Sequence, residues 1–592
     1  MTGCIDIHGF SPTTGGWLLC GWASSSSQRA LAGSPAIELE FERGTLSGVA
    51  QVVGTLRDDL GDRGFGLMAF LCASGDRDLG ALRSAVIGGG IDAVALDATP
   101  GTERRGGERL LDSMRAQRPA PGAGDTDRFE RLLRRPDFHG QDTIEQLGRQ
   151  IALRIDEAIP CGDDPGSRGL LLNGWLLAAP NAVRGIRLRS GARTTRFDTR
   201  EGVPVDRPDV VALHGDALRN HKVGCGFVLV VPDCLDGDEP PYLEVETIRG
   251  EVAFTPLAPF HPGGGSGGGL SAIRGVLNNL SPRFDRVQPV FDRLGPALRS
   301  LNRARLRDRP APRELRFGEP PAAPSCSVIV PLYGRIDFME VQVALFAAGG
   351  FRQRHELIYV VDDPANLLSA CRLAESLFAR FAVPLRLLLL DENLGFAPAC
   401  NVGLAVAVGE HVCFLNSDVL APEPDWLDRL LHTLSAHPSV GLLGPMLLFE
   451  DDTVQHRGMD YAPLFEFGGW LFPTHPGKGS WPPESRGLVY PPAITGACML
   501  MSRSLAVELG GFDEDYLIGD FEDSDLCLRA RARGELCAVD TAVTLYHLER
   551  RSQVGAAENW RMNVTLFNAW QHQKIWASTL SGIAAPGHGS AP

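Results

Sequence analysis

DENLGFAPACNVGLAVAVGEHVCFLNSD, residues 391–418, joins a turn, a small-residue segment and a short apolar run. Asn393 and Gly395 supply the backbone freedom that a sharp reversal of the chain needs. The Ala- and Gly-rich segment 397–408 is suited to a helix that packs very close to a sheet. Residues 412–415, VCFL, are typical of a strand that is buried on both faces, as in a parallel sheet. The stretch therefore predicts an α/β domain.

The strand at 412–415 ends on the polar triplet Asn416-Ser417-Asp418, and two apolar strands precede it in the chain. They are residues 327–331, which end at a proline, and residues 357–361, which end on Asp362-Asp363. Helical lengths separate the strands, which indicates parallel βαβ units whose carboxyl ends meet at one edge of the sheet. Ligands bind at that edge, so the triplet is a candidate metal or phosphate site. An ordinary turn is the alternative, since all three residue types form turns.

The bulk composition restricts the class of protein. With 592 residues the chain is expected to hold more than one domain, and its formal charge of -15 argues against a general nucleic-acid binder. No apolar run approaches the roughly 18 residues of a membrane-spanning helix. The N-terminus, MTGCIDIHGF, lacks the basic region and the apolar region of a signal peptide. The 13 cysteines include no CxxC pair, which predicts buried thiols in a reducing cytoplasm.

A related pattern occurs twice in the N-terminal half of the chain. Each copy has a Gly-flanked apolar strand that ends in Trp, then an Arg-x-Asp sequence, then a Gly-x-Gly sequence. The pieces are GWLLCGW at 16–22, Arg57 to Asp59 and GFGL at 64–67, and then GLLLNGW at 169–175, Arg207 to Asp209 and GCGF at 224–227. The pattern predicts two copies of one module, with coincidence as the alternative.

The two copies are expected to be β-rich modules over residues 1–115 and 150–258, joined by a polar segment at 116–149. An exposed Trp22 or Trp175 would suit stacking on the apolar face of a sugar ring. Both tryptophans lie in apolar strands, however, which favours packing in the core.

Residues 259–323 are expected to form a linker. It begins with a flexible hinge, GGGSGGG at 263–269, and continues with the Arg-rich stretch 281–313. The apolar residues of that stretch allow a short amphipathic helix, which could contact an anionic membrane surface. A solvated linker, or a helix docked on an acidic domain, is the alternative.

A second group of carboxylates occurs in the C-terminal part of the chain. A helix is predicted to begin near Asp523, with acidic residues at its positive end. Capping of that helix accounts for one or two acids but not for the others. The full group comprises Asp513, Glu514 and Asp515 in GGFDEDY, and Asp520, Glu522, Asp523 and Asp525 in GDFEDSDLCLR.

These motifs, in this order, resemble a family 2 glycosyltransferase with the GT-A fold. The resemblance covers residues 324–580, under half of the chain, with a disordered tail expected at 581–592. It implies an α/β catalytic domain with a mostly parallel, Rossmann-like sheet. The matching pieces are SVIVPLYGR, VVDDP, NLGFAPACNVG, FLNSDV, TGACMLMSRS, GGFDEDYLIGDFEDSDLCLRARARG and Tyr546-His547.

The resemblance also implies roles for individual residues. Asp523 matches the general base, with Glu522 orienting it, and Asp418 and His547 match the metal ligands. Asn416 stands at the first position of the DxD motif, which leaves one fewer charge on the metal. The nucleotide-binding residues implied are Pro331, Asp362, Asp363, Asp391, Asn393 and Asn416, and the acceptor-binding residues are Asp513 and Glu514.

The chemistry of glycosyl transfer suits these residue types. A divalent ion, Mn or Mg, would neutralise the leaving diphosphate, and an imidazole ligand favours Mn. A carboxylate base is worth about 10²–10⁴ in rate. A base on the face opposite the leaving group implies inversion.

The resemblance therefore implies an inverting, metal-dependent glycosyltransferase. Its donor would be a UDP- or dTDP-sugar, its acceptor a glycan or a lipid-linked glycan, and its role bacterial surface polysaccharide synthesis. We expect it in the cytoplasm, with a peripheral contact to the inner face of the plasma membrane as an option. A sugar-phosphate nucleotidyltransferase is one alternative, but VPLYGR at 330–335 is not the Gly-rich phosphate loop it would need. The other is a carbohydrate-binding protein with an inactive transferase domain, against which the joint presence of the carboxylates and His547 argues.

Overall fold

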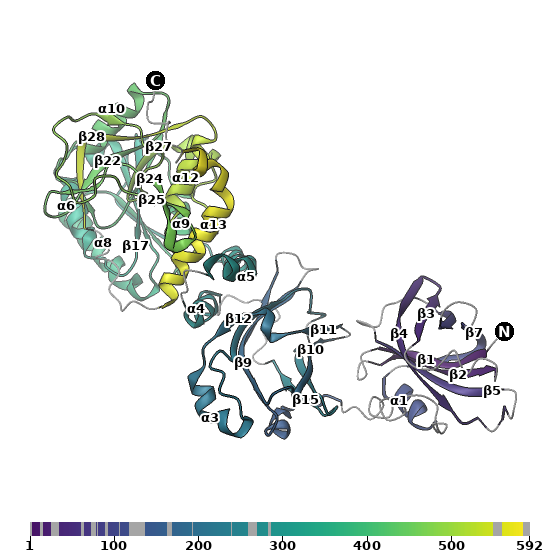
Figure 1. Ribbon diagram of the computed structural model, residues 1–592. Helices are drawn as coiled ribbons and strands as arrows, with labels where there is room; N and C mark the ends of the chain where they lie inside the picture. The colour runs from purple at the N-terminus through teal and green to yellow at the C-terminus, as the bar shows by residue number, and fades with distance from the viewer. Residues whose placement is uncertain are drawn as a thin grey trace. The chain divides into compact units, whose positions relative to one another are not determined.

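The computed structural model forms two compact units, residues 1–263 and 264–592 (Figure 1). Each unit is described by itself. The residues described are 3–11, 16–24, 35–57, 59–60, 64–72, 79, 81–88, 93–105, 107–117, 137–162, 168–191, 193–237, 239–257, 269–281, 286–548 and 559–583.

The chain begins with a closed β-barrel in the strand order β1-β2-β5-β4-β3-β6-β7. Alternating residues point inward, as Ile37, Leu39 and Phe41 do in β3, and pack around the buried Trp17. The helix α1 (Gly107–Arg115) follows. The strands are β1 (Gly3–Ser11), β2 (Gly16–Ser24), β3 (Ala36–Phe41), β4 (Gly44–Thr55), β5 (Gly64–Cys72), β6 (Leu82–Ile87) and β7 (Val94–Arg104).

The second β-rich part has two four-stranded sheets, β11-β10-β14-β15 and β12-β13-β9-β8, with the helix α3 (Pro208–Leu218). Both N-terminal parts are thus β-rich as predicted, but one is a barrel and the other is not, so the repeat stays a prediction. The strands are β8 (Ile151–Cys161), β9 (Gly169–Ala178), β10 (Val183–Ser190), β11 (Arg193–Phe197), β12 (Val203–Val205), β13 (Gly226–Val231), β14 (Tyr242–Thr247) and β15 (Val252–Pro256).

The two β-rich parts contain matching local contacts. In each, a tryptophan of the Gly-flanked strand pairs with the second glycine of the Gly-x-Gly sequence, Trp22 with Gly66 and Trp175 with Gly226. In each part, one arginine also forms ion pairs with two aspartates. One aspartate lies at a bulge in a strand, and the other lies two residues after the arginine in the chain. The groups are Arg57 with Asp6 at 2.7 Å and Asp59 at 2.8 Å, and Arg207 with Asp156 at 3.0 Å and Asp209 at 2.8 Å.

Gly21 and Gly174 are expected to be irreplaceable at equivalent places in the two parts. A Cβ at Gly21 would overlap the carbonyl oxygen of Cys4, and one at Gly174 the carbonyl oxygen of Arg154. Substitution of either by alanine should therefore destabilise the chain by about 1–3 kcal/mol, as overpacking does. Thermal unfolding would measure the effect.

Gly101→Ala and Gly185→Ala are matched controls. A Cβ at these positions would meet no atom closer than 3.9 Å and 3.5 Å respectively, so unfolding should change little. Unchanged unfolding in Gly21→Ala and Gly174→Ala would contradict the packing described here.

The C-terminal unit is built on a large sheet with the strand order β16-β19-β18-β17-β20-β27-β22-β28-β21. β17 runs parallel to β18 and β20, and β18 runs parallel to β19, which confirms the predicted parallel α/β core. The strands are β16 (Arg313–Phe317), β17 (Cys326–Leu332), β18 (His355–Val361), β19 (Leu385–Leu389), β20 (His411–Leu415), β21 (Val419–Leu420), β22 (Val440–Leu448), β27 (Cys498–Ser502) and β28 (Leu536–His547).

Helices cover both faces of this sheet (Figure 1). α6 (Phe338–Ala347), α8 (Leu367–Phe381) and α10 (Trp426–Ala436) pack on one face. The other face carries α9 (Phe396–Val406), α11 (Arg503–Glu508), α12 (Glu522–Arg531) and α13 (Asn559–Ile583). Four short strands follow β22 in the chain. β23 (Val454–His456) pairs with β22, β26 (Leu488–Val489) pairs with β28, and β24 (Asp460–Leu464) and β25 (Trp470–Thr474) form a separate hairpin.

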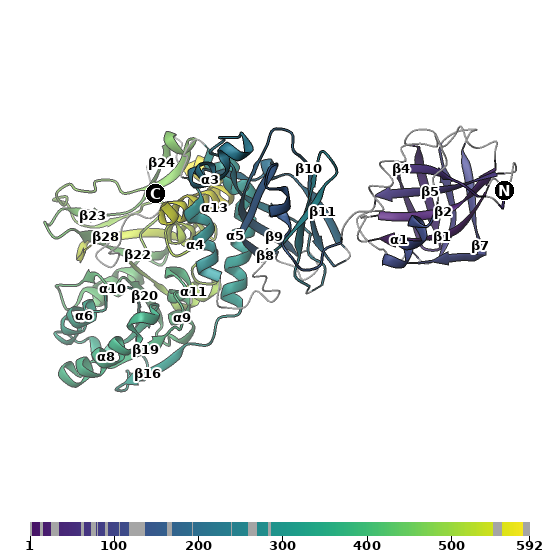
Figure 2. The ribbon, with the colours of Figure 1, turned by 90° about the horizontal axis from the view of Figure 1, so that it is seen from below.

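The expected linker at 259–323 differs from the structure. α4 (Gly269–Asn279) and the 21-residue α5 (Val287–Arg307) pack against α13 (Figure 2). The ring of Phe291 in α5 lies edge-on to that of Phe567 in α13, with the ring centroids 5.8 Å apart. α5 also binds the acidic cluster, since Arg303 pairs with Asp515 at 2.6 Å. Buried apolar contacts and these ion pairs explain why the segment folds as part of the C-terminal unit. In the structure the Arg-rich stretch therefore follows the alternative named above, since its helix, α5, is docked on acidic residues of the same unit.

Three other boundary predictions lie partly outside the described residues. α13 continues to Ile583, so the expected tail at 581–592 begins inside a helix, and residues 584–592 lie outside the described part. The hinge at 263–269 falls outside it except for Gly269, as does most of the polar segment 116–149. Among the described residues, no helix has the length and apolar composition needed to cross a membrane.

Candidate active site

The predicted metal ligands Asp418 and His547 lie side by side. β21 pairs with β28 so that Val419 is opposite His547, and the N–H of Leu548 donates to the carbonyl of Asp418 at 3.1 Å. Nε2 of His547 lies 3.4 Å from Oδ1 of Asp418, and both side chains are buried. The structure therefore brings together two residues that are far apart in the sequence.

The turn that carries Asp418 is held in place from α6. The amide of Gln342 donates to the carbonyls of Asn416 and Val419 at 2.9 and 3.0 Å, and the hydroxyl of Tyr359 donates to Gln342 at 3.1 Å. Sequence reasoning missed Gln342. The available signal was a polar residue on the buried face of a mostly apolar helix.

The donor set fits a divalent ion that shares its coordination with a ligand. No group of three or more His, Cys, Asp or Glu side chains suited to a metal occurs in the part of the chain that the structure describes. Asp418 and His547 supply one carboxylate and one imidazole. Mg²⁺ and Mn²⁺ sites in phosphate-transferring enzymes commonly use one or two protein ligands and fill the rest with phosphate oxygens and water.

Asp523 lies at the same edge of the sheet, at the start of α12. Its Oδ2 accepts from the N–H of Gly496 at 3.0 Å, and its Oδ1 from the N–H of Ser524 at 2.7 Å. The adjacent Ala497 accepts from the N–H of Asn416 at 2.8 Å, which links the Asp523 region to the Asp418 turn. Burial raises the pKa of Asp523, so the carboxylate is a stronger base than an exposed aspartate.

Glu522 is buried, and its Oε2 has no hydrogen-bond partner among the described residues. Burial, together with the charges of Asp523 and Asp520, raises its pKa well above the ordinary value, which favours the neutral acid. No contact between Glu522 and Asp523 orients the latter in the structure. The orienting role implied for Glu522 therefore stays a prediction.

The carboxylate of Asp362 binds the backbone of the turn after β19. Its two oxygens accept from the N–H groups of Leu394 and Gly395 at 2.6 and 2.8 Å, and the side chain is buried. Burial raises its pKa to about 7, while those hydrogen bonds and Arg305 counteract the shift. Asp362 therefore fixes the backbone of this turn, and its nucleotide-binding role stays a prediction.

Asp363 and Asp391 likewise have partners. Asp363 accepts from the N–H of Gly334 at 3.0 Å and of Ala365 at 3.1 Å, while the exposed Asp391 pairs with Arg313 at 3.1 Å. These contacts hold loops at the carboxyl ends of the strands. The nucleotide-binding role of both residues stays a prediction.

Pro331, Asn393 and Asn416 are half-buried at the same edge. The side chains of Asn393 and Asn416 make no hydrogen bond within the described residues, so their amides can bind a ligand. Among the six predicted nucleotide-binding residues, Asn393 and Asn416 are the ones whose polar side chains have no hydrogen-bond partner in the described part of the chain.

The predicted acceptor-binding residues are placed differently. Glu514 pairs with Arg309, two residues after α5, at 2.9 Å and accepts from Asn401 of α9 at 3.0 Å, so it joins these two segments. Asp513 accepts from the N–H of Asp515 at 2.9 Å. Burial raises the pKa of Asp513. Both carboxylates thus have structural partners, and the structure gives no support to acceptor binding by Glu514.

Two histidines near Asp523 were not predicted. Nδ1 of the buried His456 lies 3.0 Å from Nδ1 of His475, and Nε2 of His456 accepts from the N–H of Thr495 at 3.3 Å. Burial lowers the pKa of His456 well below its usual value, so it is neutral and carries its proton on Nδ1. Both histidines lie in the segment 451–492, whose many Gly, Pro and aromatic residues are typical of a long loop over a site and were the available signal.

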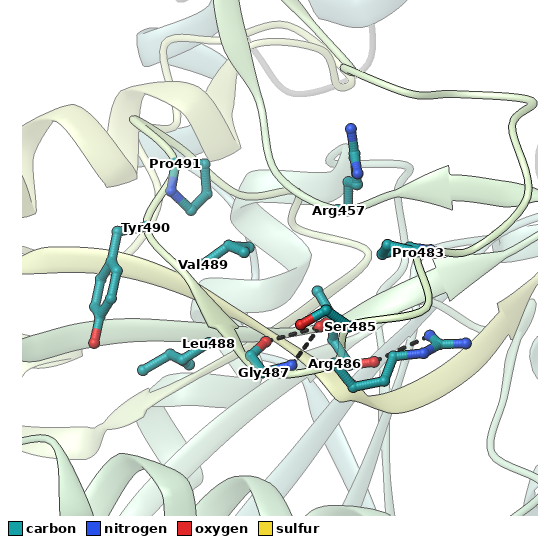
Figure 3. Close-up of a pocket in the computed structure, with 10 residues that line it drawn as sticks. Arg457, Pro483, Ser485, Arg486, Gly487, Leu488, Val489, Tyr490 and Pro491 are labelled. Atoms are coloured by element: carbon teal, nitrogen blue, oxygen red, sulfur yellow. Dashed lines mark hydrogen bonds between the residues drawn. The ribbon is translucent and has the colours of Figure 1, made fainter. Parts of the chain in front are cut away.

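A cavity of about 520 Å³ is lined mostly by residues of this same segment (Figure 3). Arg457, next to His456, lines it from one side, and the segment 483–491, with Arg486 and Tyr490, from the other. Neither arginine pairs with a carboxylate among the described residues. The cavity therefore suits a ligand with an anionic group.

Comparisons with known proteins match this chain to one family and to relatives in bacteria. The family Glycosyl transferase family 2 matches residues 327–486. The O-antigen biosynthesis protein RfbC of Myxococcus xanthus is 30% identical over 275 residues, 44% of this chain and 20% of that protein. The N-acetylglucosaminyl-diphospho-decaprenol L-rhamnosyltransferase of Mycobacterium tuberculosis is 30% identical over 217 residues, 33% of this chain and 70% of that protein. The chain thus spans about a fifth of the first relative's length.

Similar solved structures include two glycosyltransferases. One is the mannosyltransferase PcManGT of Pyrobaculum calidifontis in complex with GDP-Man and Mn²⁺, 18% identical with a TM-score of 0.29, covering 55% of this chain and 88% of that one. The other is GalNAc-T7 with UDP, GalNAc and Mn²⁺, 15% identical with a TM-score of 0.32, covering 44% of this chain and 52% of that one.

Proposed function

The chain belongs to glycosyl transferase family 2, and from this we propose that it transfers a sugar from a nucleotide-sugar donor to an acceptor hydroxyl, with inversion. One observation carries the proposal. The Asp418–His547 pair and Asp523 meet at the carboxyl edge of the sheet, joined through the hydrogen bonds of Gly496 and Ala497. Such an edge is where open α/β sheets bind their ligands.

In this proposal Asp418 and His547 hold a divalent ion, with Mn²⁺ favoured by the imidazole. When bound, the ion neutralises charge on the leaving nucleoside diphosphate. Asp523 accepts the proton of the attacking acceptor hydroxyl, for which its raised pKa suits it. The buried Glu522, as a neutral acid, adds no second negative charge beside Asp523.

The donor nucleotide is proposed to bind along the ends of β17, β18 and β19, against the amides of Asn393 and Asn416. A UDP- or dTDP-sugar remains the proposed donor. The test is isothermal titration of the intact chain with UDP, dTDP and GDP in the presence and absence of Mn²⁺. Binding that requires Mn²⁺ is expected, and no binding of any of the three would contradict the proposal.

The acceptor is proposed to enter through the cavity beside His456. Arg457 and Arg486 suit an acidic acceptor, such as a glycan on a lipid diphosphate. The relative named as a rhamnosyltransferase acts, by its name, on N-acetylglucosaminyl-diphospho-decaprenol, and the other takes part in O-antigen synthesis. A role in bacterial surface polysaccharide synthesis therefore remains our proposal.

The matching contacts of Arg57 and Arg207 support our proposal that residues 1–115 and 150–258 are copies of one module. The expected membrane contact through the Arg-rich stretch stays a prediction, which now rests on the exposed arginines of that stretch alone. Arg303 and Arg309 pair with carboxylates of the same unit, and Arg305 is buried.

A further inference from the structure

The turn Asn393-Leu394-Gly395 is held by side chains on two sides. Its N–H groups donate to Asp362, as described above. On the opposite side, Nη1 of Arg305 donates to the carbonyl of Asn393 at 2.7 Å, and Nη2 to the carbonyl of Leu394 at 3.0 Å. The backbone of the turn is therefore fixed by a carboxylate on its donors and a guanidinium on its acceptors.

Arg305 is well suited to this task. It lies on the buried face of α5 with 5% of its surface exposed, and Nη2 also donates to Oδ1 of Asn302 at 2.9 Å. Asn302 in turn donates to the carbonyl of Glu514 at 2.8 Å, which fixes its own orientation. A planar guanidinium can serve two neighbouring carbonyls at once, which the single ammonium of lysine does not do equally well.

The loop before Asp523 has an unusual backbone. Ile518, Asp520 and Phe521 have φ angles of 60°, 94° and 77°, in the left-handed region that non-glycine residues rarely adopt. Such conformations cost on the order of 1–3 kcal/mol each and persist only where the surroundings impose them. The loop therefore needs an external support.

Asn568 of α13 supplies that support. Its side chain is fully buried; Oδ1 accepts from the N–H of Leu517 at 2.9 Å. Nδ2 donates to the carbonyls of Leu517 and Gly519, both at 3.0 Å, and of Asp520 at 3.2 Å. One amide thus binds the loop on both sides of Ile518.

The turn and the loop are themselves in contact. The N–H of Phe396 donates to the carbonyl of Ile518 at 2.6 Å. A Cβ at Gly395, whose φ is 101°, would lie 2.8 Å from Cα of Ile518, so only glycine permits this approach. Displacement of either segment therefore disturbs the other.

Both supports come from one packed pair of helices. α5 and α13 lie side by side (Figure 2). Nε1 of Trp570 in α13 donates to Asp292 of α5 at 2.9 Å, and a Cβ at Gly295 would lie 2.4 Å from the ring of Trp570. α5 and α13 both lie outside residues 327–486, the part matched by the family. The family match therefore does not cover them.

We propose that Arg305 and Asn568 are positioning residues of the transfer site. Arg305 sets the turn that presents Asn393 to the donor nucleotide, and Asn568 sets the loop that leads into Asp523. This assignment rests on the proposed function.

Arg305 is tested with Arg305→Ala and Arg305→Lys, against Arg303→Ala as control. Arg303 lies on the same helix, but its ion pair with Asp515 is 47% exposed on the arginine side. In Arg305→Ala we expect hydrogen exchange at the amides of 394–396 to accelerate at least about tenfold, and the Kd for UDP or dTDP with Mn²⁺ to rise about 10–100-fold. Arg305→Lys should recover part of both losses, and Arg303→Ala should change neither more than about threefold.

Asn568 is tested with Asn568→Asp, against Asn563→Asp as a matched control. Asn563 is a second buried asparagine of α13, but its Nδ2 donates to the carbonyls of Leu277 and Leu280 at 2.7 and 2.8 Å. Both variants should lose stability. At a temperature where both are folded, only Asn568→Asp should lower kcat, by about 100-fold, with a much smaller rise in the Kd for nucleotide, passed on through the Phe396–Ile518 contact.

Unchanged exchange at 394–396 in Arg305→Ala would overturn the assignment of Arg305. Equal kcat in the two asparagine variants would overturn that of Asn568. Exchange needs no ligand, so it reports on the turn independently of the proposed function. If the unaltered chain neither binds nucleotide nor releases it from sugar donors, the proposed function fails, and the assignment fails with it.

Discussion

Asp523→Asn is expected to lower turnover by about 10²–10⁴ and to leave donor affinity intact. The loss equals the usual contribution of a general base, because an amide cannot accept the proton of the acceptor hydroxyl. Asparagine has one acceptor oxygen, so it can keep only one of the two hydrogen bonds from the N–H groups of Gly496 and Ser524; some stability should be lost, but the fold should persist. Donor titration and steady-state kinetics on the same preparation would separate the two effects.

The pH dependence of turnover tests the role of Asp523 in a second way. Burial raises the pKa of Asp523, and the base works only when deprotonated. Turnover of the unaltered chain should therefore rise with pH through that raised pKa, and Asp523→Asn should lose this acid limb.

Asp525→Asn serves as the neighbouring control. Asp525 accepts from Arg529 at 2.7 Å and from Trp576 at 2.8 Å, so its loss should lower stability but not the turnover of folded molecules. Near-normal turnover in Asp523→Asn would show that Asp523 is not the base, and Glu522 or Asp520 would become the candidate.

Asp418→Ala is expected to weaken donor binding about 100-fold or more when Mn²⁺ is present. Asp418 supplies the carboxylate of the proposed metal site, and a Lewis-acid ion contributes several kcal/mol of charge stabilisation. The fold should survive, since the turn is also held by Gln342.

The metal itself provides the control for Asp418→Ala. With EDTA, the unaltered chain and the variant should bind UDP or dTDP equally weakly, because neither then holds an ion. Equal affinity in the presence of Mn²⁺ would remove Asp418 from the metal site.

Local sequence patterns predicted much of the catalytic unit. The opening stretch folds as expected, with α9 at Phe396–Val406 and β20 at His411–Leu415, and a helix begins at Glu522 next to the predicted Asp523. Small residues, apolar runs and helix starts act within a few residues, so they can be read from the sequence. The order of motifs then predicted that Asp418, His547 and Asp523 belong to one site.

Contacts between distant segments could not be predicted in this way. The Arg-rich stretch looked like a linker because its charges are paired only in the fold, with Asp515 and Glu514 about 200 residues later in the chain. Asp362 was expected to bind the nucleotide, a role that stays a prediction; its hydrogen bonds to the turn after β19 could not be read from the sequence. The support of that turn by Arg305 has no local signature at all.

Release of nucleoside diphosphate from candidate donors tests the central claim most directly. The intact chain would be incubated with UDP- and dTDP-sugars, Mn²⁺ and a glycan on a lipid diphosphate. We predict release that requires both metal and acceptor and that Asp523→Asn nearly abolishes. Nucleotide binding without release from any donor would instead favour a carbohydrate-binding protein, and pyrophosphate formation from a sugar phosphate and a nucleoside triphosphate would show a nucleotidyltransferase.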